Sequence, residues 1–385
     1  MKNILFVRST PYNEDINGYN VQGIGIAKAF CRLGYNCDYL NFDTDRDEVV
    51  DLCEYNQNKA RVIYKKRIRI LRTGVNFKVL SKSFLQKYDI VICREYNQLM
   101  SYLIAKRHPN TSIYSGPYWN MFMIPFFSNI YDFLITNKLN KLAKNKFVKS
   151  QLAKEFLEKK GYDNVIDVGV GLDTSRFENA VCTKNTQNIV DYMSKNRCVL
   201  YVGTLDENKN LSFILKVFAK LLEKEPDVKL VLIGKSKQSL KNKLLGMNDE
   251  SYYTNLINSV PSKIKDSIIH IDRVDNPELK YIYPLAKAFI LPSIHEIFGM
   301  VMLEAMYFGA PVITSLNGGS STLIKTNDYG IKIDNYDVEE WVAGLVKYLE
   351  DSEYSKQVVE KCKCNIRENY TWKSICLKML KNIND

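Results

Sequence analysis

Short apolar runs alternate with amphipathic stretches along most of the chain. The runs at 4–8, 89–93 and 198–202 are rich in apolar residues and short enough to be buried strands. The stretch after the third run carries apolar residues at helical spacing, namely Phe213, Val217 and Leu221. The repeated order of strand, loop and helix predicts doubly wound α/β domains.

The same pattern predicts the remaining elements. Further strands are expected at 37–41, 112–115, 165–168, 230–233, 268–271 and 288–291. Further helices are expected at 21–33, 126–145, 151–160, 277–286 and 301–308. The residues near 178–196 are polar and poorly patterned, so we interpret them as a linker.

The chain of 385 residues is long enough for two domains, each with its own core. We place the first domain at 1–180 and the second at 196–365. Ligands of open α/β sheets bind outside the carboxyl ends of the strands. Two such domains face to face would therefore share one interdomain cleft, where we expect the chemistry.

The composition narrows the class of protein. No apolar run reaches the ~18 to 20 residues of a membrane span. The N-terminus leads directly into a strand, which is unlike a signal peptide. Nine cysteines without a CxxC pair favour a reduced, cytoplasmic protein. The histidines lack metal-ligand spacing; they are His108, His270 and His295.

Positive charge is concentrated in the first half of the chain. The net charge is +11, and the stretch 61–87 holds nine Lys and Arg residues without an acid. A second basic stretch, 138–149, holds five Lys residues, and apolar residues are interleaved with both. The favoured partner is an anionic membrane surface or a phosphate-bearing acceptor. Each cation near an anionic bilayer adds about 1 kcal/mol of attraction. A plain solvated face is the alternative, and nucleic acid is disfavoured.

Two carboxylates flank one loop in the second half. Glu296 and Glu304 stand eight residues apart, after the apolar run 288–291 and a Pro-Ser turn. A helix is expected from 301 onward, so the backbone N–H groups before it could hold an anion. Those groups belong to Phe298, Gly299 and Met300. The arrangement offers one carboxylate for a polar ring, amides for a phosphate and another carboxylate for a ribose.

This stretch resembles the Glu-x7-Glu element of retaining glycosyltransferases of family four. The resemblance implies a GT-B fold, in which two Rossmann-like domains face a cleft. It assigns Glu296 to the donor sugar, the loop 298–300 to sugar and phosphate, and Glu304 to the nucleotide ribose. The alternative is two solvated carboxylates that flank the start of a helix.

The resemblance extends to other loops. In 203–210, Lys209 matches a lysine that binds the donor diphosphate, while Thr204 stands where the family usually has an arginine. Three further residues complete the implied donor site. Val274 would receive the base through its backbone, Leu279 would pack nearby, and Gly18 would face the donor phosphate; these roles too are implied by the resemblance.

The first domain departs from the family pattern. Many members carry a histidine after the strand expected at 112–115, but here the chain reads Ser-Gly-Pro and then Tyr118 and Trp119. We assign Tyr118 and Trp119 to the acceptor side. His108 lies upstream and is disfavoured as a catalytic residue. A Gly-x-Gly at 23–25 suggests a dinucleotide fingerprint, which we reject because its third glycine is replaced by Lys28.

The implied function is retaining, metal-independent hexosyl transfer from a UDP- or GDP-sugar, with no obligatory cofactor. The acceptor would be a glycan, a lipid-linked molecule or a cell-surface polymer, and the enzyme would be cytoplasmic or peripheral on the inner membrane face. Residues 366–385 would form a closing helix that crosses back to the first domain. Two alternatives stay open: a nucleotide-sugar epimerase on the same fold, and a non-catalytic sugar or anionic-polymer binding protein.

Overall fold

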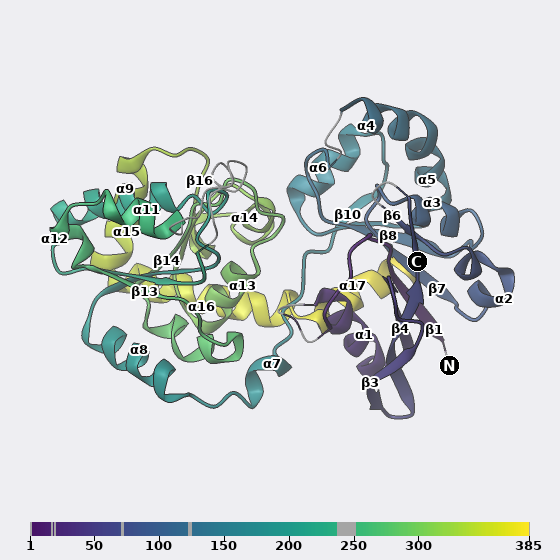
Figure 1. The fold of residues 1–385 in the computed structure, drawn as a ribbon, viewed down its shortest axis with the longest axis horizontal. Helices are drawn as coiled ribbons and strands as arrows, with labels where there is room; N and C mark the ends of the chain where they lie inside the picture. Colours follow the sequence, from purple (N-terminus) through teal and green to yellow (C-terminus); the bar gives the residue numbers. More distant parts are fainter. Residues whose placement is uncertain are drawn as a thin grey trace. The chain divides into compact units, whose positions relative to one another are not determined.

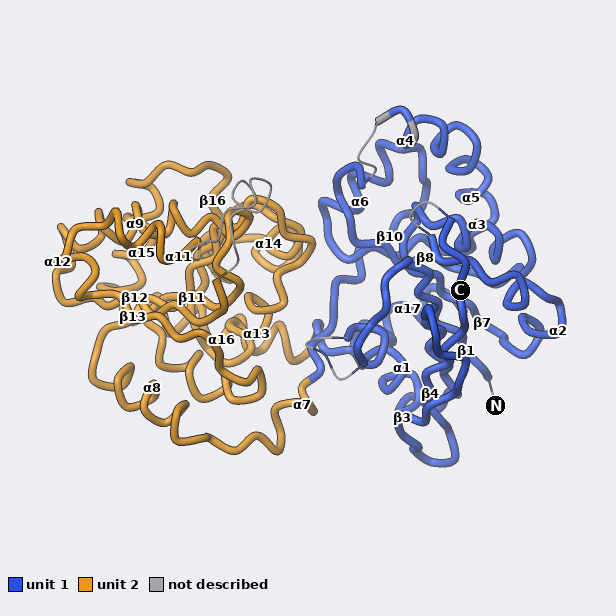
Figure 2. Tube along the Cα trace, in the orientation of Figure 1, with its two compact units in different colours: residues 1–173, 369–385 blue, residues 174–368 orange. Residues whose placement is uncertain are grey.

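The computed structural model describes residues 2–16, 18, 21–70, 73–121, 125–236 and 252–384. The chain forms two compact units, one made of residues 1–173 and 369–385 and the other of residues 174–368. Figures 1 and 2 show that each unit is built around its own sheet. Leu71 and Arg72, in the first basic stretch, lie outside the described residues.

Unit 1 is centred on an eight-stranded sheet in the order β10-β9-β8-β7-β1-β2-β4-β3. Its strands pair in parallel except for the edge pair β3 and β4. The parallel strands are β1 (Asn3–Arg8), β2 (Asn36–Asp43), β4 (Asn58–Lys66), β7 (Ile90–Arg94), β8 (Thr111–Ser115), β9 (Lys146–Val148) and β10 (Val165–Asp167). The antiparallel edge strand is β3 (Val49–Tyr55).

Helices and a small hairpin complete unit 1 (Figure 1). The longer helices are α1 (Gln22–Arg32), α3 (Leu99–Ala105), α4 (Pro125–Tyr131), α5 (Asn137–Leu142), α6 (Gln151–Lys159) and α17 (Trp372–Asn384). Shorter segments are the hairpin β5 (Ile68–Ile70) and β6 (Thr73–Val75), and the helices η1 (Phe77–Leu80), α2 (Lys82–Leu85) and the π-helical η2 (Asp132–Thr136). The helix expected at 126–145 is therefore three helical segments in succession.

The chain's last helix, α17, packs on α1 within unit 1. The ring of Trp372 lies so close to Gly25 that a Cβ there would stand 2.2 Å from Nε1. A Cβ on Gly23 would likewise stand 2.3 Å from the ring of Tyr39. Both glycines are thus explained by close packing, in agreement with the rejection of a dinucleotide fingerprint.

Unit 2 is centred on a six-stranded parallel sheet in the order β13-β12-β11-β14-β15-β16. Its strands are β11 (Cys198–Val202), β12 (Lys229–Ile233), β13 (Ile268–Ile271), β14 (Ala288–Leu291), β15 (Val312–Ser315) and β16 (Ile331–Ile333). The strand order reverses between β11 and β14. Loops at the carboxyl ends of these two strands therefore form the place where such sheets bind ligands.

The described helices of unit 2 precede, connect and follow these strands. They are α7 (Ser175–Glu178), α8 (Lys184–Lys195), α9 (Leu211–Lys224), α11 (Tyr252–Asn258), α12 (Ser262–Lys265), α13 (Met300–Phe308), α14 (Gly318–Leu323), α15 (Val338–Glu350) and α16 (Ser352–Asn369), with short 3₁₀ segments η3 (Asn276–Tyr281), η4 (Tyr283–Leu285) and η5 (Asn327–Tyr329).

Two sequence-based assignments are wrong. The supposed linker 178–196 contains helix α8, whose start is capped by the side chain of Thr183. The helix expected at 277–286 is instead the pair of 3₁₀ segments η3 and η4. Pro284 lies in the interior of the expected helix and lacks the backbone N–H that a continuing α-helix would need, whereas Pro277 stands in the first turn, where proline is tolerated.

The two basic stretches carry less unpaired positive charge than their sequences suggest. Lys146 pairs with Asp163 at 2.9 Å, and Lys149 is buried against Glu95 at 3.2 Å. In the first stretch, Arg61 forms two hydrogen bonds of 2.8 Å with Asp38 of the neighbouring strand. Acids distant in sequence thus neutralise part of each stretch. Among the described residues, none of the helices has the length and apolarity to span a bilayer.

Candidate active site

Lys209 and Glu296 meet in unit 2 through a direct ion pair between Nζ and Oε2. Lys209 lies in the loop from β11 to α9, and Glu296 lies in the loop from β14 to α13. Each side chain is 18% exposed, so the pair is half-buried yet reachable from solvent. The Lys209 backbone N–H donates to Asp206 Oδ1 at 3.0 Å, which fixes the base of the lysine.

Asn208 fastens these two loops together. Its Nδ2 donates to the His295 carbonyl oxygen at 2.9 Å, and its Oδ1 accepts from the His295 N–H at 3.1 Å. The Asn208 carbonyl oxygen also accepts from the Ile294 N–H at 2.9 Å. The position of Glu296 relative to Lys209 is therefore held by hydrogen bonds to the adjacent backbone.

The start of α13 lies directly after Glu296. Gly299 has a φ of +75° and forms the N-cap without a side-chain hydrogen bond. Phe298 is buried, and Gly319 approaches it so closely that a Cβ there would stand 1.7 Å from the Phe298 carbonyl oxygen. Helix geometry leaves the amides of Met300 and Val301 without intrahelical acceptors, whereas the Met302 N–H already donates to the Gly299 carbonyl oxygen at 2.9 Å. An anion could therefore bind at this helix start.

Glu304 is 2% exposed, one turn into α13. Its Oε2 accepts hydrogen bonds from Asn276 Nδ2 at 3.0 Å and from the Tyr283 hydroxyl at 3.2 Å. The Oδ1 atom of Asn276 is buried and has no hydrogen-bond partner among the described residues. The carboxylate and this amide oxygen together form an acceptor pair suited to hydroxyl groups. Nearby in the chain, Leu279 is buried and Val274 half-buried.

Thr204 stands where the resemblance expects an arginine. Its hydroxyl donates to Asp206 Oδ2 at 2.9 Å, and its carbonyl oxygen accepts from Tyr201 at 2.8 Å. Arg273, another cation of these loops, is 71% exposed and pairs with Asp275 at 3.1 Å. Lys209 is therefore the cation that the described loops bring to Glu296.

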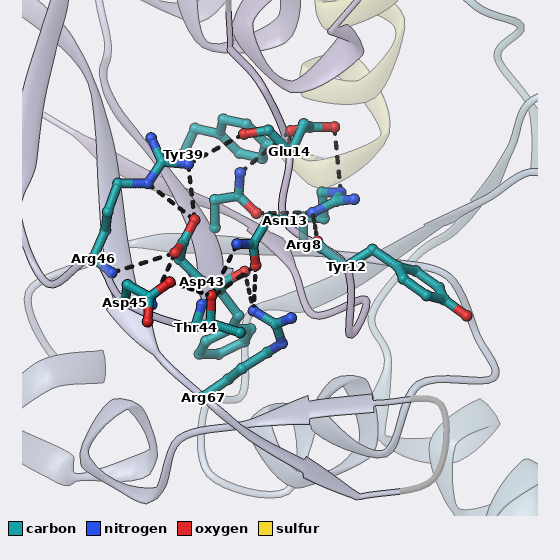
Figure 3. A network of polar contacts seen from close by, with 12 residues as sticks. Arg8, Tyr12, Asn13, Glu14, Tyr39, Asp43, Thr44, Asp45, Arg46 and Arg67 are labelled. Atoms are coloured by element: carbon teal, nitrogen blue, oxygen red, sulfur yellow. Dashed lines mark hydrogen bonds and ion pairs between the residues drawn. The ribbon is translucent and has the colours of Figure 1, made fainter.

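In unit 1, the loop that carries Gly18 is anchored by a polar network, which Figure 3 shows from close by. Arg67 donates to Asn13 Oδ1 at 2.7 Å, and Asn13 Nδ2 donates to Thr44 at 2.9 Å. Arg8 donates to the Tyr12 carbonyl oxygen at 2.9 Å. The Gly18 N–H donates to Asp15 at 3.0 Å, and its neighbours in the chain, residues 17, 19 and 20, lie outside the described residues.

The other residues singled out in unit 1 follow the strand β8 or precede it. Tyr118 and Trp119 are half-buried and stack edge to face at 4.6 Å. His108 is buried, and its Nε2 lies 2.9 Å from the Tyr88 carbonyl oxygen, so its role is structural. His295 contributes backbone contacts to the loop beside Glu296.

Some residues of these sites gave no signal in the sequence. Asn208 and Asn276 are ordinary loop asparagines until the fold brings them to His295 and Glu304. Gly234 lies so close to the Gly203 carbonyl oxygen that a Cβ would stand 1.8 Å from it. The one available clue was position, because both glycines end strands of a parallel sheet.

Comparison with known proteins finds matches to the part of the chain that contains Lys209 and Glu296. Residues 184–363 match the family model described as "Glycosyl transferases group 1". An uncharacterized glycosyltransferase of Methanocaldococcus jannaschii is 27% identical over 191 residues, which is 50% of this chain and 45% of that protein. The mannosylfructose-phosphate synthase of Agrobacterium fabrum is 26% identical over 190 residues, 48% of this chain and 39% of that protein. The chain thus matches less than half the length of these relatives.

Solved structures resemble the whole chain. Alr3699/HepE of Anabaena, in complex with UDP, has a TM-score of 0.71 at 16% identity and covers 100% of both chains. The sucrose-phosphate synthase of Thermosynechococcus elongatus has a TM-score of 0.64 at 16% identity and covers 99% of this chain and 98% of its own. The fold is therefore the two-domain α/β fold of the GT-B type, as the sequence indicated.

Proposed function

We propose that this chain is a retaining glycosyltransferase that moves a hexosyl group from a nucleotide-diphosphate sugar to an acceptor. The observation that carries the proposal is the pairing of Lys209 with Glu296 beside the start of α13. The pair lies on loops that follow β11 and β14, in the region matched by the glycosyl transferase family model.

The leaving diphosphate would be stabilised by two features. Lys209 supplies a fixed cation, and the first amides of α13 supply oriented donors for a phosphate oxygen. Neither feature must reorganise as negative charge develops, which is why such preorganised groups favour the transition state. On this proposal no metal ion is obligatory.

Glu296 would hold the donor sugar and stabilise positive charge that develops on its ring. The Lys209 contact orients this carboxylate before the donor arrives. Glu304 and the unpaired Oδ1 of Asn276 would accept hydrogen bonds from the ribose hydroxyls. The backbone at Val274 would receive the base, and Leu279 would pack nearby.

The comparisons support a uridine donor. Structures of HepE are described as complexes with UDP, with UDP and glucose, and with UDP-glucose. A further neighbour of similar fold, described as trehalose-6-phosphate from E. coli, is bound with UDP-2-fluoro glucose. We therefore rank a UDP-sugar above a GDP-sugar as the donor for this chain.

The acceptor would be a glycan, a lipid-linked molecule or a cell-surface polymer bound to unit 1 near Tyr118 and Trp119.

Unit 1 exposes large apolar side chains along α4 and η2, with exposed fractions of 65%, 39%, 84% and 49% for Phe126, Ile130, Phe133 and Leu134. Their spacing puts them on one helical face, which we call the apolar face. Exposed Lys138 and Lys141 follow it. This combination favours docking on an anionic membrane surface.

Thermal unfolding with a panel of UDP-, GDP- and ADP-sugars tests the donor. A ligand at a hundredfold excess over its Kd adds about 2.7 kcal/mol to the free energy of unfolding. We expect one UDP-sugar and UDP itself to stabilise the protein. Stabilisation by none of the panel would contradict the proposed donor site.

Substitution of Glu296 by Gln tests the chemistry. We expect donor binding to persist while turnover falls by about 10² or more, because the charge on the sugar is no longer stabilised. Glu339→Gln is the matched control, since Glu339 is an exposed carboxylate of the same unit. Full turnover in the Glu296 variant would refute the role, and nucleotide release without any acceptor would favour epimerisation.

A further inference from the structure

Five charged side chains gather where the parallel strands of unit 1 reach their carboxyl ends. Arg8 ends β1, Arg94 ends β7 with Glu95 after it, and Lys149 follows β9. Glu14 reaches the same edge from the loop after β1, where Figure 3 shows it beside Arg8. Because these strands are parallel, their carboxyl ends meet at one edge. We call these five residues the edge cluster.

The charges of the edge cluster alternate in space. Glu95 lies between Lys149, with Oε1 3.2 Å from Nζ, and Arg94, with Oε1 3.7 Å from Nε. Glu14 lies between Arg94, at 3.9 Å from NH1, and Arg8, at 3.3 Å from Nε. Three cations against two carboxylates leave one positive charge in excess. The surplus makes the cluster suited to an anion.

Arg94 is the member whose hydrogen-bonding capacity is unused. Arg8 donates to Tyr12 and Asn41, whereas among the described residues the Arg94 guanidinium donates no hydrogen bond, and its buried Nε has no acceptor. Its contacts of 3.7 and 3.9 Å with the two carboxylates are too long for hydrogen bonds. The side chain is 21% exposed although its Nε is buried, so part of it can be reached from solvent.

Glu95, which lies between Lys149 and Arg94, has a strained backbone and a side chain held by several hydrogen bonds. Its φ is +70°, a left-handed conformation that residues other than glycine rarely adopt. Its Oε2 accepts from the Ser115 hydroxyl and the Gly116 N–H, each at 3.0 Å, and its carbonyl oxygen accepts from Ser101 at 2.8 Å. Such strain costs about 1 kcal/mol or more and is concentrated at functional sites.

We infer that the edge cluster is an oxyanion-binding subsite, in which the Arg94 guanidinium binds a phosphate or carboxylate group of the acceptor. Glu95 acts as a positioning residue because it lies against Arg94 and accepts from the Gly116 N–H, and Lys149 in turn holds Glu95 through its ion pair. That the bound group belongs to an acceptor rests on the proposed function. The anion site itself rests only on the geometry of unit 1.

Thermal unfolding of the full chain in inorganic phosphate, compared with sodium chloride of equal ionic strength, tests the subsite. A parallel series in sodium acetate separates phosphate from carboxylate recognition. Saturating UDP is present to occupy the donor site, and Lys209→Met provides a chain whose donor-site cation is removed. We expect phosphate or acetate to raise the Tm of the wild type and of Lys209→Met.

Arg94→Met should weaken that anion affinity by at least about tenfold, the loss of one charge-assisted hydrogen bond. Arg107→Met is the matched control, because Arg107 is an exposed arginine just before β8, at the amino end of the sheet. If Arg94→Met does not fold, Arg94→Lys keeps the cation but loses the planar fork, and a similar loss is expected. Undiminished anion binding in the Arg94 variant that folds, or no effect of either anion on the wild type, overturns the inference. Failure of UDP to bind would affect only the proposed function.

Discussion

Glu296 and Glu304 show how identical side chains come to differ in exposure and in hydrogen-bond partners. Glu296 is 18% exposed and pairs with Lys209, so a ligand can reach the carboxylate while the lysine orients it. Glu304 is 2% exposed and accepts from the neutral donors Asn276 and Tyr283. On the proposed function, this difference in exposure and partners suits Glu296 to the reacting sugar and Glu304 to binding of the ribose.

Glu304→Gln should weaken the binding of UDP by roughly 10 to 100-fold. The amide would retain the shape of the side chain but replace one acceptor oxygen with a donor that faces Asn276. Isothermal titration with UDP measures the effect, with Glu339→Gln as the control for loss of an exposed carboxylate. Unchanged affinity would remove Glu304 from the donor site.

Lys149 should make the stability of unit 1 depend on pH. Burial lowers its pKa to about 8, from about 10.4 in an unfolded chain. Between these values the unfolded state binds more protons, so the free energy of unfolding rises with pH, by roughly 2 kcal/mol from about pH 8 to about pH 10. Lys149→Met should lack this gain. Urea unfolding of both proteins over this range checks it, and parallel curves would contradict it.

At the scale of elements, unit 1 is closed by a helix from the far end of the chain. Trp372, at the start of α17, lies against Gly25 of α1 and against Gly171, whose Cβ would stand 2.5 Å from the Trp372 backbone nitrogen. The ring is 4% exposed. The absence of side chains at these two glycines creates the space that the indole fills, so α17 is part of the core of unit 1.

Trp372→Ala should therefore destabilise unit 1 by about 3 to 5 kcal/mol, because it leaves a cavity of indole size. Leu377→Ala is the matched control, since Leu377 is on the same helix and 47% exposed, and should be nearly neutral. Hydrogen exchange of β1 and α1 distinguishes loss of unit 1 from loss of unit 2. Equal protection in both variants would show that α17 is dispensable for the core.

At the scale of the whole molecule, positive charge and exposed apolar surface coincide in unit 1. The chain carries a net charge of +11, and its first 180 residues hold 27 Lys and Arg against 18 Asp and Glu. Ion pairs with acids of unit 1 offset the charges of three of these residues, Arg61, Lys146 and Lys149. The cations near the apolar face, Lys138 and Lys141, are exposed. Membrane attraction should therefore depend on the apolar face as much as on total charge.

Vesicles rich in anionic lipid should sediment the protein at low salt and release it at high salt, because exposed charges are screened. Phe133→Ser combined with Leu134→Ser should reduce the bound fraction severalfold, since two apolar anchors are lost. Val181→Ser is the control, because Val181 is 78% exposed in unit 2. Equal sedimentation of all three proteins would exclude docking through the apolar face.

Local sequence patterns determined much of this protein. The buried strands at 4–8, 89–93 and 198–202 were predictable because a short apolar run fits only a strand covered on both faces. The helix start after Glu296 was predictable because Gly299 and the apolar residues that follow it are close in sequence. The roles assigned to these residues stay predictions.

The tertiary structure decided whatever depended on partners distant in sequence. The edge cluster draws its residues from four segments between 8 and 149, and no window of sequence contains them together. From the sequence alone the basic stretches seemed to carry unpaired positive charge. Their counter-charges, such as Asp38 and Asp163, lie on other segments of the chain. Hydrophobic periodicity is a local property of the chain, whereas the pairing of charges is set by which strands become neighbours in the sheet.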